Sequence, residues 1–107
     1  APQPDVMVLR GQPRDYPDAF PTTAVVLLIV EVADSSVAID RQLAADYARE
    51  QIPAYWLLNL VDRRVESFTE PVEGAYTRRA VYGPDDAIPV VLDGRERGRI
   101  EVRRLLP

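Results

Sequence analysis

The stretch VVLLIVEV, residues 25–32, decides how this chain folds, because seven of its eight positions are aliphatic. A run of β-branched and aliphatic residues without polar alternation is typical of a strand that is buried on both faces of its sheet. We therefore expect a central strand here. Its one acidic residue, Glu31, is costly to bury unless a metal ion, a hydrogen-bond network or water receives the charge.

The residues that follow this strand have the pattern of an amphipathic helix. Ser35 and Ser36 can cap its start and Pro53 must end it, so we expect the helix over residues 37–51. Residues at i, i+4 spacing predict its apolar face, namely Ile39, Leu43 and Tyr47, with Ala44 and Ala48 as further candidates. The opposite face is predicted to contact water through Asp40, Arg41 and Glu50.

Strands are predicted on both sides of this strand–helix unit. The expected ranges are 5–10, 54–60, 65–69, 76–81 and 88–92, while 100–106 is either a last strand or a short helix, and 12–23 is a proline-rich loop. A buried strand, a helix and another buried strand favour a right-handed crossover between parallel neighbours, with antiparallel partners outside them. The sequence therefore predicts one domain over residues 1–107 of the α/β (α+β) class, with a mixed sheet and one main helix.

A single helix can cover only one face of such a sheet. We expect the core to be incomplete towards the N-terminus, so that an upstream segment or another subunit covers the second face. A homo-oligomer is one form of this expectation.

The composition excludes several kinds of site. The chain has 107 residues with no cysteine, no histidine and no lysine, so all 13 basic residues are arginines. Disulfides, thiolate chemistry, the usual zinc ligands and any lysine-dependent step are thereby excluded. The formal net charge of -4 does not suit a general nucleic-acid binder. The apolar runs are too short to span a bilayer and no signal peptide is visible, so a cytoplasmic protein is expected.

Two carboxylates stand on strands that we expect to be neighbours. Asp5 begins the first strand, within PDVMVL at residues 4–9, and Glu31 lies near the end of the second. Mg²⁺ is typically held by one or two carboxylates together with water and phosphate oxygens. The pair therefore predicts a site for a hard, oxygen-ligated cation, and the alternative for Asp5 is an ordinary residue at the start of a strand.

Four motifs, in this order, resemble one family of proteins. They are PDV at residues 4–6, VEVADSS at 30–36, YAR at 47–49 and IPAYWL at 52–57. The family is that of the restriction-endonuclease-like proteins found in many copies in cyanobacteria and other bacteria, within the PD-(D/E)XK nuclease superfamily. The resemblance covers most of the chain and implies a restriction-endonuclease-like fold, of which this sequence is expected to be the C-terminal portion or a short relative.

This resemblance implies a Mg²⁺-dependent or Mn²⁺-dependent endonuclease that hydrolyses phosphodiester bonds in DNA. Asp5, Glu31 and the main-chain carbonyl of Val32 are implied to hold the metal ion, which would lower the pKa of a bound water. Ser35 and Arg41 are the candidate contacts to nucleic acid.

A lysine that orients the attacking water completes this site in the superfamily, and here no position supplies one. Its usual place, two residues after the glutamate, is Ala33, and its place on the following helix corresponds to Leu43 or Ala44. Gln42 and Arg41 are the candidate replacements. The alternatives to an active nuclease are a catalytically degraded relative that still binds metal or DNA, and a structural or oligomerisation module.

Overall fold

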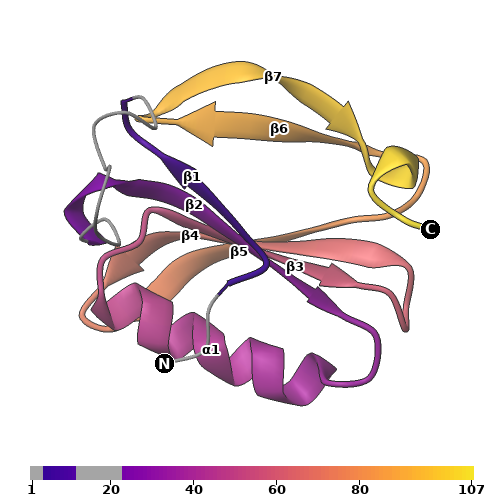
Figure 1. The fold of residues 1–107 in the computed structure, drawn as a ribbon, viewed down its shortest axis with the longest axis horizontal. Helices are drawn as coiled ribbons and strands as arrows, with labels where there is room; N and C mark the ends of the chain where they lie inside the picture. The colour runs from indigo at the N-terminus through magenta and orange to yellow at the C-terminus, as the bar shows by residue number, and fades with distance from the viewer. Residues whose placement is uncertain (1–3, 12–22) are drawn as a thin grey trace.

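The structure is a computed structural model that describes residues 4–11 and 23–107. A five-stranded mixed sheet lies at its centre, with one helix on one face and a two-stranded hairpin on the other (Figure 1). The sheet has the strand order β1-β2-β3-β4-β5, and β6 pairs with β7. In chain order the elements are β1 (Val6–Leu9), η2 (Thr23–Val25), β2 (Val26–Ala33), α1 (Val37–Arg49), β3 (Ala54–Asn59), β4 (Arg64–Val72), β5 (Ala75–Tyr82), β6 (Ala87–Leu92), β7 (Arg95–Glu101) and η3 (Val102–Arg104). This architecture confirms the predicted α+β class with a mixed sheet and one main helix.

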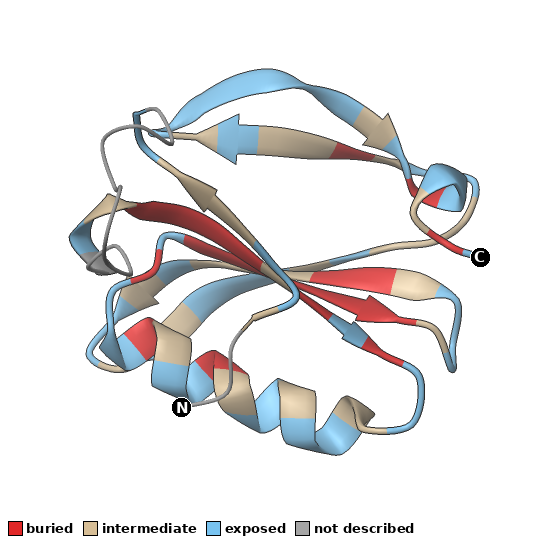
Figure 2. Cartoon of the chain, viewed as in Figure 1, coloured by how far each residue is buried: buried red, intermediate tan, exposed pale blue. Residues whose placement is uncertain are grey.

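The two apolar runs of the sequence form the centre of the sheet. β2 and β3 pair in parallel, with Ile29 opposite Tyr55 and Val32 opposite Leu58. Every residue of β3 and most of β2 are buried (Figure 2). β1 pairs antiparallel with β2, and β4 pairs antiparallel with β3. The prediction of parallel central strands with antiparallel neighbours is confirmed, whereas the loop predicted over 12–23 lies almost wholly outside the described residues.

The helix ends two residues earlier than the sequence predicts. Gln51 has a φ of 61°, and the N–H groups of Gln51 and Ile52 donate to the carbonyls of Ala48 and Tyr47 at 3.0 Å each. A left-handed residue that satisfies the last carbonyls in this way closes a helix, so Pro53 follows an end that is already made. At the other end, Ser36 holds the N-cap position without a capping hydrogen bond. In the part of the chain that the structure describes, no helix has the length and apolar character needed to cross a membrane.

Small residues form the face of α1 that lies against the sheet. Ala44 and Ala48 are buried, whereas Ile39, which was predicted to face the core, is exposed. Ala44 belongs to the same apolar cluster as Tyr55, and a small side chain leaves room for that large aromatic ring. The predicted helix face is therefore rotated away from Ile39 and towards Ala44 and Ala48, which were the further candidates for that face.

Because of this rotation, we expect two substitutions on α1 to have very different effects on the free energy of unfolding. Ile39→Asn removes an apolar side chain from water and should change the free energy of unfolding by no more than about 0.5 kcal/mol. Ala48→Leu inserts methylenes under a helix that lies close to the sheet and should cost about 1–3 kcal/mol. Urea unfolding followed by circular dichroism measures both. Equal losses in the two variants would contradict the orientation of α1.

The hairpin of β6 and β7 covers much of the second face of the sheet. Ile88 of β6, Val102 of η3 and Leu106 are buried in one apolar cluster with Trp56 and Leu58 of β3. The expectation that the chain leaves this face uncovered is therefore wrong over that area. This cover is hard to predict from the sequence, because β7 begins at Arg95 in a stretch without apolar residues, and the pattern indicates a strand or a helix only from Ile100 onward. Residues 100–106 contain both, since the strand ends at Glu101 and η3 follows.

Candidate functional site

Asp5 and Glu31 lie together where β1 meets β2. Val6 pairs with Val30, so the next pair of residues along the two antiparallel strands is Asp5 and Glu31. The N–H of Asp5 donates to Oε1 of Glu31 at 3.0 Å, and the N–H of Val32 donates to Oδ2 of Asp5 at 2.7 Å. The structure thus brings the two acids together, as the sequence predicts, and each carboxylate is oriented by the backbone of the opposite strand.

Glu31 is a buried carboxylate that has no cation beside it among residues 4–11 and 23–107. Its residue is 5% exposed, on the face of the sheet that α1 covers. Burial raises the pKa of Glu31 above its ordinary value, and the negative charges of Asp5 and Asp40 add to this, although hydrogen bonds from Asp5 and Tyr47 act in the opposite direction. Among the described residues, no arginine forms an ion pair with Glu31. The charge of this carboxylate is therefore uncompensated within the described chain.

Tyr47 completes the surroundings of Glu31. Its hydroxyl donates to Oε2 of Glu31 at 2.9 Å, so a hydrogen-bond donor contacts each carboxylate oxygen. Burial and this contact raise the pKa of Tyr47, which keeps the hydroxyl protonated as a donor. The ring lies edge-on to Tyr55 at 5.1 Å, and the Tyr55 hydroxyl donates to the carbonyl of Asp40 at 2.7 Å. Sequence reasoning assigned Tyr47 to the core, and the only signal of another role was its place in the YAR motif.

The residues of this edge suit a hard divalent cation. Both carboxylates offer oxygen ligands, and the charge that burial leaves uncompensated on Glu31 is one that a cation would neutralise. Val32, whose main-chain carbonyl is the third predicted ligand, is bonded to Asp5 through its N–H. No group of three or more acidic residues that could hold a metal occurs within 4–11 and 23–107, so water and phosphate oxygens would complete the coordination. The metal-binding roles stay predictions.

The structure does not bring Gln42 or Ser35 to the carboxylate pair. Gln42 precedes Tyr47 by five positions, which turns its side chain by roughly 140° around the helix from the residue that contacts Glu31. It is exposed. Ser35 is also exposed, and its hydroxyl donates to Oδ1 of Asp34 at 3.3 Å. Ala44, one of the two lysine-equivalent positions, is buried.

A second buried carboxylate, Glu66, lies on the same face of the sheet. Glu31 pairs with Leu57, and Leu57 pairs with Glu66, so the two glutamates flank one leucine in a row across the strands. Their Cα atoms are thus two interstrand spacings apart, about 10 Å. Sequence reasoning missed Glu66, because the alternating pattern of residues 65–69 predicted a strand edged by solvent.

Glu66 differs from Glu31 in being surrounded by cations. Arg41 donates to both of its oxygens, through Nε to Oε1 at 3.0 Å and through Nη2 to Oε2 at 2.7 Å. Arg79 donates to Oε1 at 2.8 Å, and Asn59 donates to Oε2 at 3.0 Å. Burial alone would raise the pKa of Glu66, but the hydrogen bonds from Arg41, Arg79 and Asn59 outweigh it and hold that pKa well below its ordinary value. Arg41, a candidate contact to nucleic acid, therefore belongs to the Glu66 cluster.

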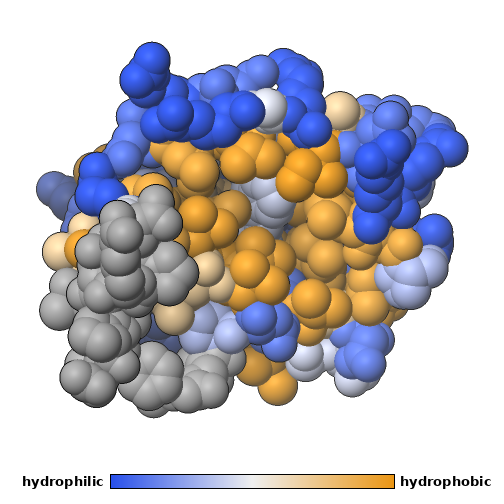
Figure 3. Space-filling view, turned by 45° about the horizontal axis from the view of Figure 1, so that its top comes forward, coloured by the Kyte–Doolittle hydropathy of each residue, from blue (hydrophilic) through white to orange (hydrophobic). Residues whose placement is uncertain are grey.

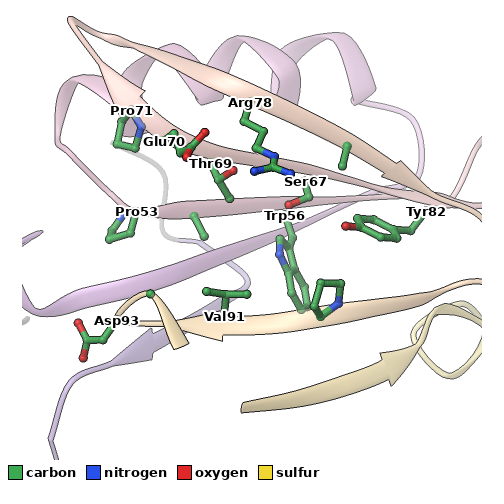
Figure 4. A pocket seen from close by; sticks show the side chains of 14 residues that line it. Pro53, Trp56, Ser67, Thr69, Glu70, Pro71, Arg78, Tyr82, Val91 and Asp93 are labelled. Carbon is green, nitrogen blue, oxygen red and sulfur yellow. The ribbon is translucent and has the colours of Figure 1, made fainter. Parts of the chain in front are cut away.

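The other face of the sheet carries an apolar groove between the sheet and the hairpin. It has a volume of about 510 Å³, and Trp56 of β3 and Val91 of β6 line it from opposite sides (Figure 4). Apolar side chains gather over a broad area of the face drawn in Figure 3, with hydrophilic side chains around them. Both buried glutamates lie on the face that α1 covers, so the candidate catalytic site lies there.

A comparison with known protein families gives a match. Neither the curated proteins nor the solved structures give a match. A family model described as "Uma2: Putative restriction endonuclease" matches residues 1–101. This range contains Asp5, Glu31, Tyr47 and Glu66, and it spans nearly the whole sequence. The chain therefore belongs to the Uma2 family of restriction-endonuclease-like proteins.

Proposed function

We propose that this protein is a metal-dependent DNA nuclease that hydrolyses phosphodiester bonds at the Asp5–Glu31 pair. The observation that carries the proposal is a buried carboxylate, Glu31, which has no cation beside it in the described part of the chain and whose neighbour across β1 and β2 is a second carboxylate. Membership of the Uma2 family supports a nuclease-type function. A buried charge is costly, so its retention at such a point favours a functional role.

The chain's own residues would hold and orient the ligands. Asp5, Glu31 and the carbonyl of Val32 would bind Mg²⁺ or Mn²⁺, and such an ion would supply a nucleophile at neutral pH and neutralise charge on the phosphate. The Asp5 N–H and the Tyr47 hydroxyl hold the two oxygens of Glu31, and the Val32 N–H holds Asp5. These outer contacts fix the direction in which the carboxylates face, which is the usual contribution of groups around metal ligands.

A catalytically degraded relative that binds metal or DNA without cleavage is the second candidate. It is favoured by the absence of lysine from the whole sequence. The structure offers no replacement near Glu31 in the described residues, because Gln42 is turned away and Arg41 is bonded to Glu66. Tyr47 keeps its proton and so cannot act as a base.

Metal binding by the Asp5–Glu31 pair predicts a rise in thermal stability. A cation that binds only the folded state adds about 2.7 kcal/mol at a concentration of roughly 100 Kd. Each kcal/mol raises the Tm of a domain of this size by about 4–8 °C. Calorimetry in EDTA and then in Mg²⁺, Mn²⁺ or Ca²⁺ measures the shift, and Asp5→Asn should remove it.

Asp85→Asn is the matched control for that titration. Asp85 is an exposed acid that contacts Arg103 at 2.6 Å, outside the candidate site, so its variant should keep the full metal-induced shift. A shift of equal size in Asp5→Asn would exclude metal binding at the pair. Nicking of supercoiled plasmid by the wild-type protein in Mg²⁺ or Mn²⁺ then separates the two candidates, because only the nuclease produces open circles.

A further inference from the structure

We propose that Arg41, Arg64 and Arg79, gathered around Glu66, form a phosphate-binding cluster that holds the backbone of a nucleic acid. The three arginines come from α1, β4 and β5, and the carboxylate at their centre is 0% exposed. The placement of the cluster beside a cleaved phosphate rests on the proposed function. Its affinity for phosphate rests on the cluster alone.

The cluster contains more positive charge than its buried carboxylate can use. An ionised carboxylate has about four lone-pair positions for hydrogen bonds. Arg41 fills two, Arg79 one and Asn59 one. Arg64 is left over, since its Nε lies 3.5 Å from Oε2 of Glu66 and is buried without a hydrogen-bond partner in the described structure. A buried donor without an acceptor is unusual in a native protein, and a water, an ion or a ligand is its usual explanation.

The three arginine side chains of the cluster are partly exposed, although Nε of Arg64 is buried. The side chains of Arg41, Arg64 and Arg79 are 42%, 35% and 47% exposed. A guanidinium has five N–H donors, and Glu66 accepts two from Arg41 and one from Arg79. The Arg79 guanidinium also lies 5.7 Å from the centre of the Phe68 ring, which helps to fix its plane. Planar, fixed guanidinium groups with free donors match the oxygens of a phosphate.

If the cluster served only to hold α1, β4 and β5 together, fewer arginines would be enough. One arginine already forms two hydrogen bonds to Glu66 from α1, and Arg79 ties in β5. A third arginine, Arg64, adds an ion pair to Glu66 at 3.5 Å but no hydrogen bond, and it lies beside two other positive charges. Asp62, at 3.9 Å from Arg64, is half-exposed and offsets only part of that charge. In a chain with a net charge of -4, this concentration of arginines favours an anionic ligand.

The position of the cluster suits a strand that also reaches the carboxylate pair. Glu66 and Glu31 lie in one row, about 10 Å apart at Cα. The phosphates of one DNA strand advance by about 3.4 Å along the helix axis and also turn around it, so this span corresponds to fewer than three nucleotides. A strand with one phosphate at Asp5 and Glu31 would therefore bring another phosphate to the arginines.

Arg64→Gln tests the cluster and leaves the four hydrogen bonds to Glu66 in place, because the contact of Arg64 with Glu66 is an ion pair without a hydrogen bond. The probe is a fluorescein-labelled 20-base-pair DNA duplex in EDTA, and its anisotropy gives the Kd over a series of salt concentrations. We expect Arg64→Gln to weaken binding roughly tenfold at low salt and to lower the slope of log K against log salt by about one. Arg79→Gln should have an effect of the same kind.

Arg49→Gln is the matched control, with the same change of charge on an exposed arginine of α1 that pairs with Asp46. Its Kd and slope should stay close to those of the wild type. The proposal that the cluster binds phosphate would be overturned if Arg64→Gln and Arg49→Gln weakened DNA binding equally. It would also be overturned if the wild type did not bind DNA at low salt. Because EDTA removes any metal, the result does not depend on cleavage. A protein that binds in this way and does not nick plasmid would refute the proposed nuclease and keep the phosphate cluster.

Discussion

Replacing Glu66 with glutamine is expected to remove a large part of the stability of this protein. The carboxylate is fully buried, and four hydrogen bonds from Arg41, Arg79 and Asn59 converge on it. Removing one partner from a buried ion pair costs about 3–5 kcal/mol, because the opposite charges stay behind. The arginines here can turn partly to water, so we expect a loss of about 3 kcal/mol. The whole free energy of unfolding of a small domain is only about 5–15 kcal/mol.

Urea unfolding at neutral pH measures this loss. Glu101→Gln is the control, because Glu101 is an exposed glutamate that pairs with Arg104 at 3.6 Å within one turn. Exposed pairs of this kind contribute about 0–1 kcal/mol. If Glu66→Gln lost no more than Glu101→Gln, the arginines would be solvated whether or not the carboxylate is present, and Glu66 would not organise them.

The effect of Glu66 should also depend on pH in a defined direction. Its pKa in the folded state lies below the ordinary value of 4.5, so the folded state releases this proton more readily than the unfolded chain. Such a group contributes stability that is fully present above pH 4.5 and is lost as the pH falls towards the folded pKa. The difference in stability between the wild type and Glu66→Gln should therefore shrink in acid. A difference that grew below pH 4.5 would contradict the assignment.

The central part of the fold could be predicted because its signals are local. The apolar runs of β2 and β3 and the helix pattern between them lie within one continuous stretch of sequence, and each element carries its own periodicity. The errors concern contacts between distant segments. Ile39 was predicted to face the core because it has i, i+4 spacing with Leu43, yet Ile39 is exposed and the small Ala44 lies in the cluster with Tyr55. The cover of the second face was missed because Arg95 begins a strand whose partner supplies most of the apolar residues.

Only part of the candidate site could be predicted, because only part of it has a local signal in the sequence. Asp5 and Glu31 could be paired because their strands were expected to be neighbours, and a carboxylate in an apolar run is a visible anomaly. Glu66 gave no such signal, since an acid in an alternating strand is ordinary. Its burial depends on Arg41 and Arg79, which lie 25 and 13 positions away in the sequence. No local pattern specifies that three elements will bring charges to one point.

Replacing Glu31 with glutamine is expected to abolish cleavage and at the same time to stabilise the metal-free protein. An amide is a poor ligand for a hard cation. Loss of a group that merely supports a ligand costs about 10–100-fold, so loss of the ligand itself should reduce the rate of plasmid nicking at least about 100-fold. The same change removes a buried charge that no arginine within the described residues compensates. We expect a gain of about 1 kcal/mol in EDTA, as is common when a functional site is relieved of strain.

The two glutamates can therefore be compared directly, because they lie in one row of the sheet. Substitution by glutamine should change the stability of the protein in opposite directions at the two positions. Glu66→Gln breaks a compensated charge and destabilises, whereas Glu31→Gln removes an uncompensated one and stabilises. Unfolding cannot explain a loss of nicking in a variant that is more stable than the wild type, so a combined loss of activity and gain in stability identifies Glu31 as functional. Full nicking by Glu31→Gln would show that the carboxylate pair does not perform the chemistry. A loss of stability in EDTA would show that Glu31 is held by contacts it needs, and the argument from its uncompensated charge would fail.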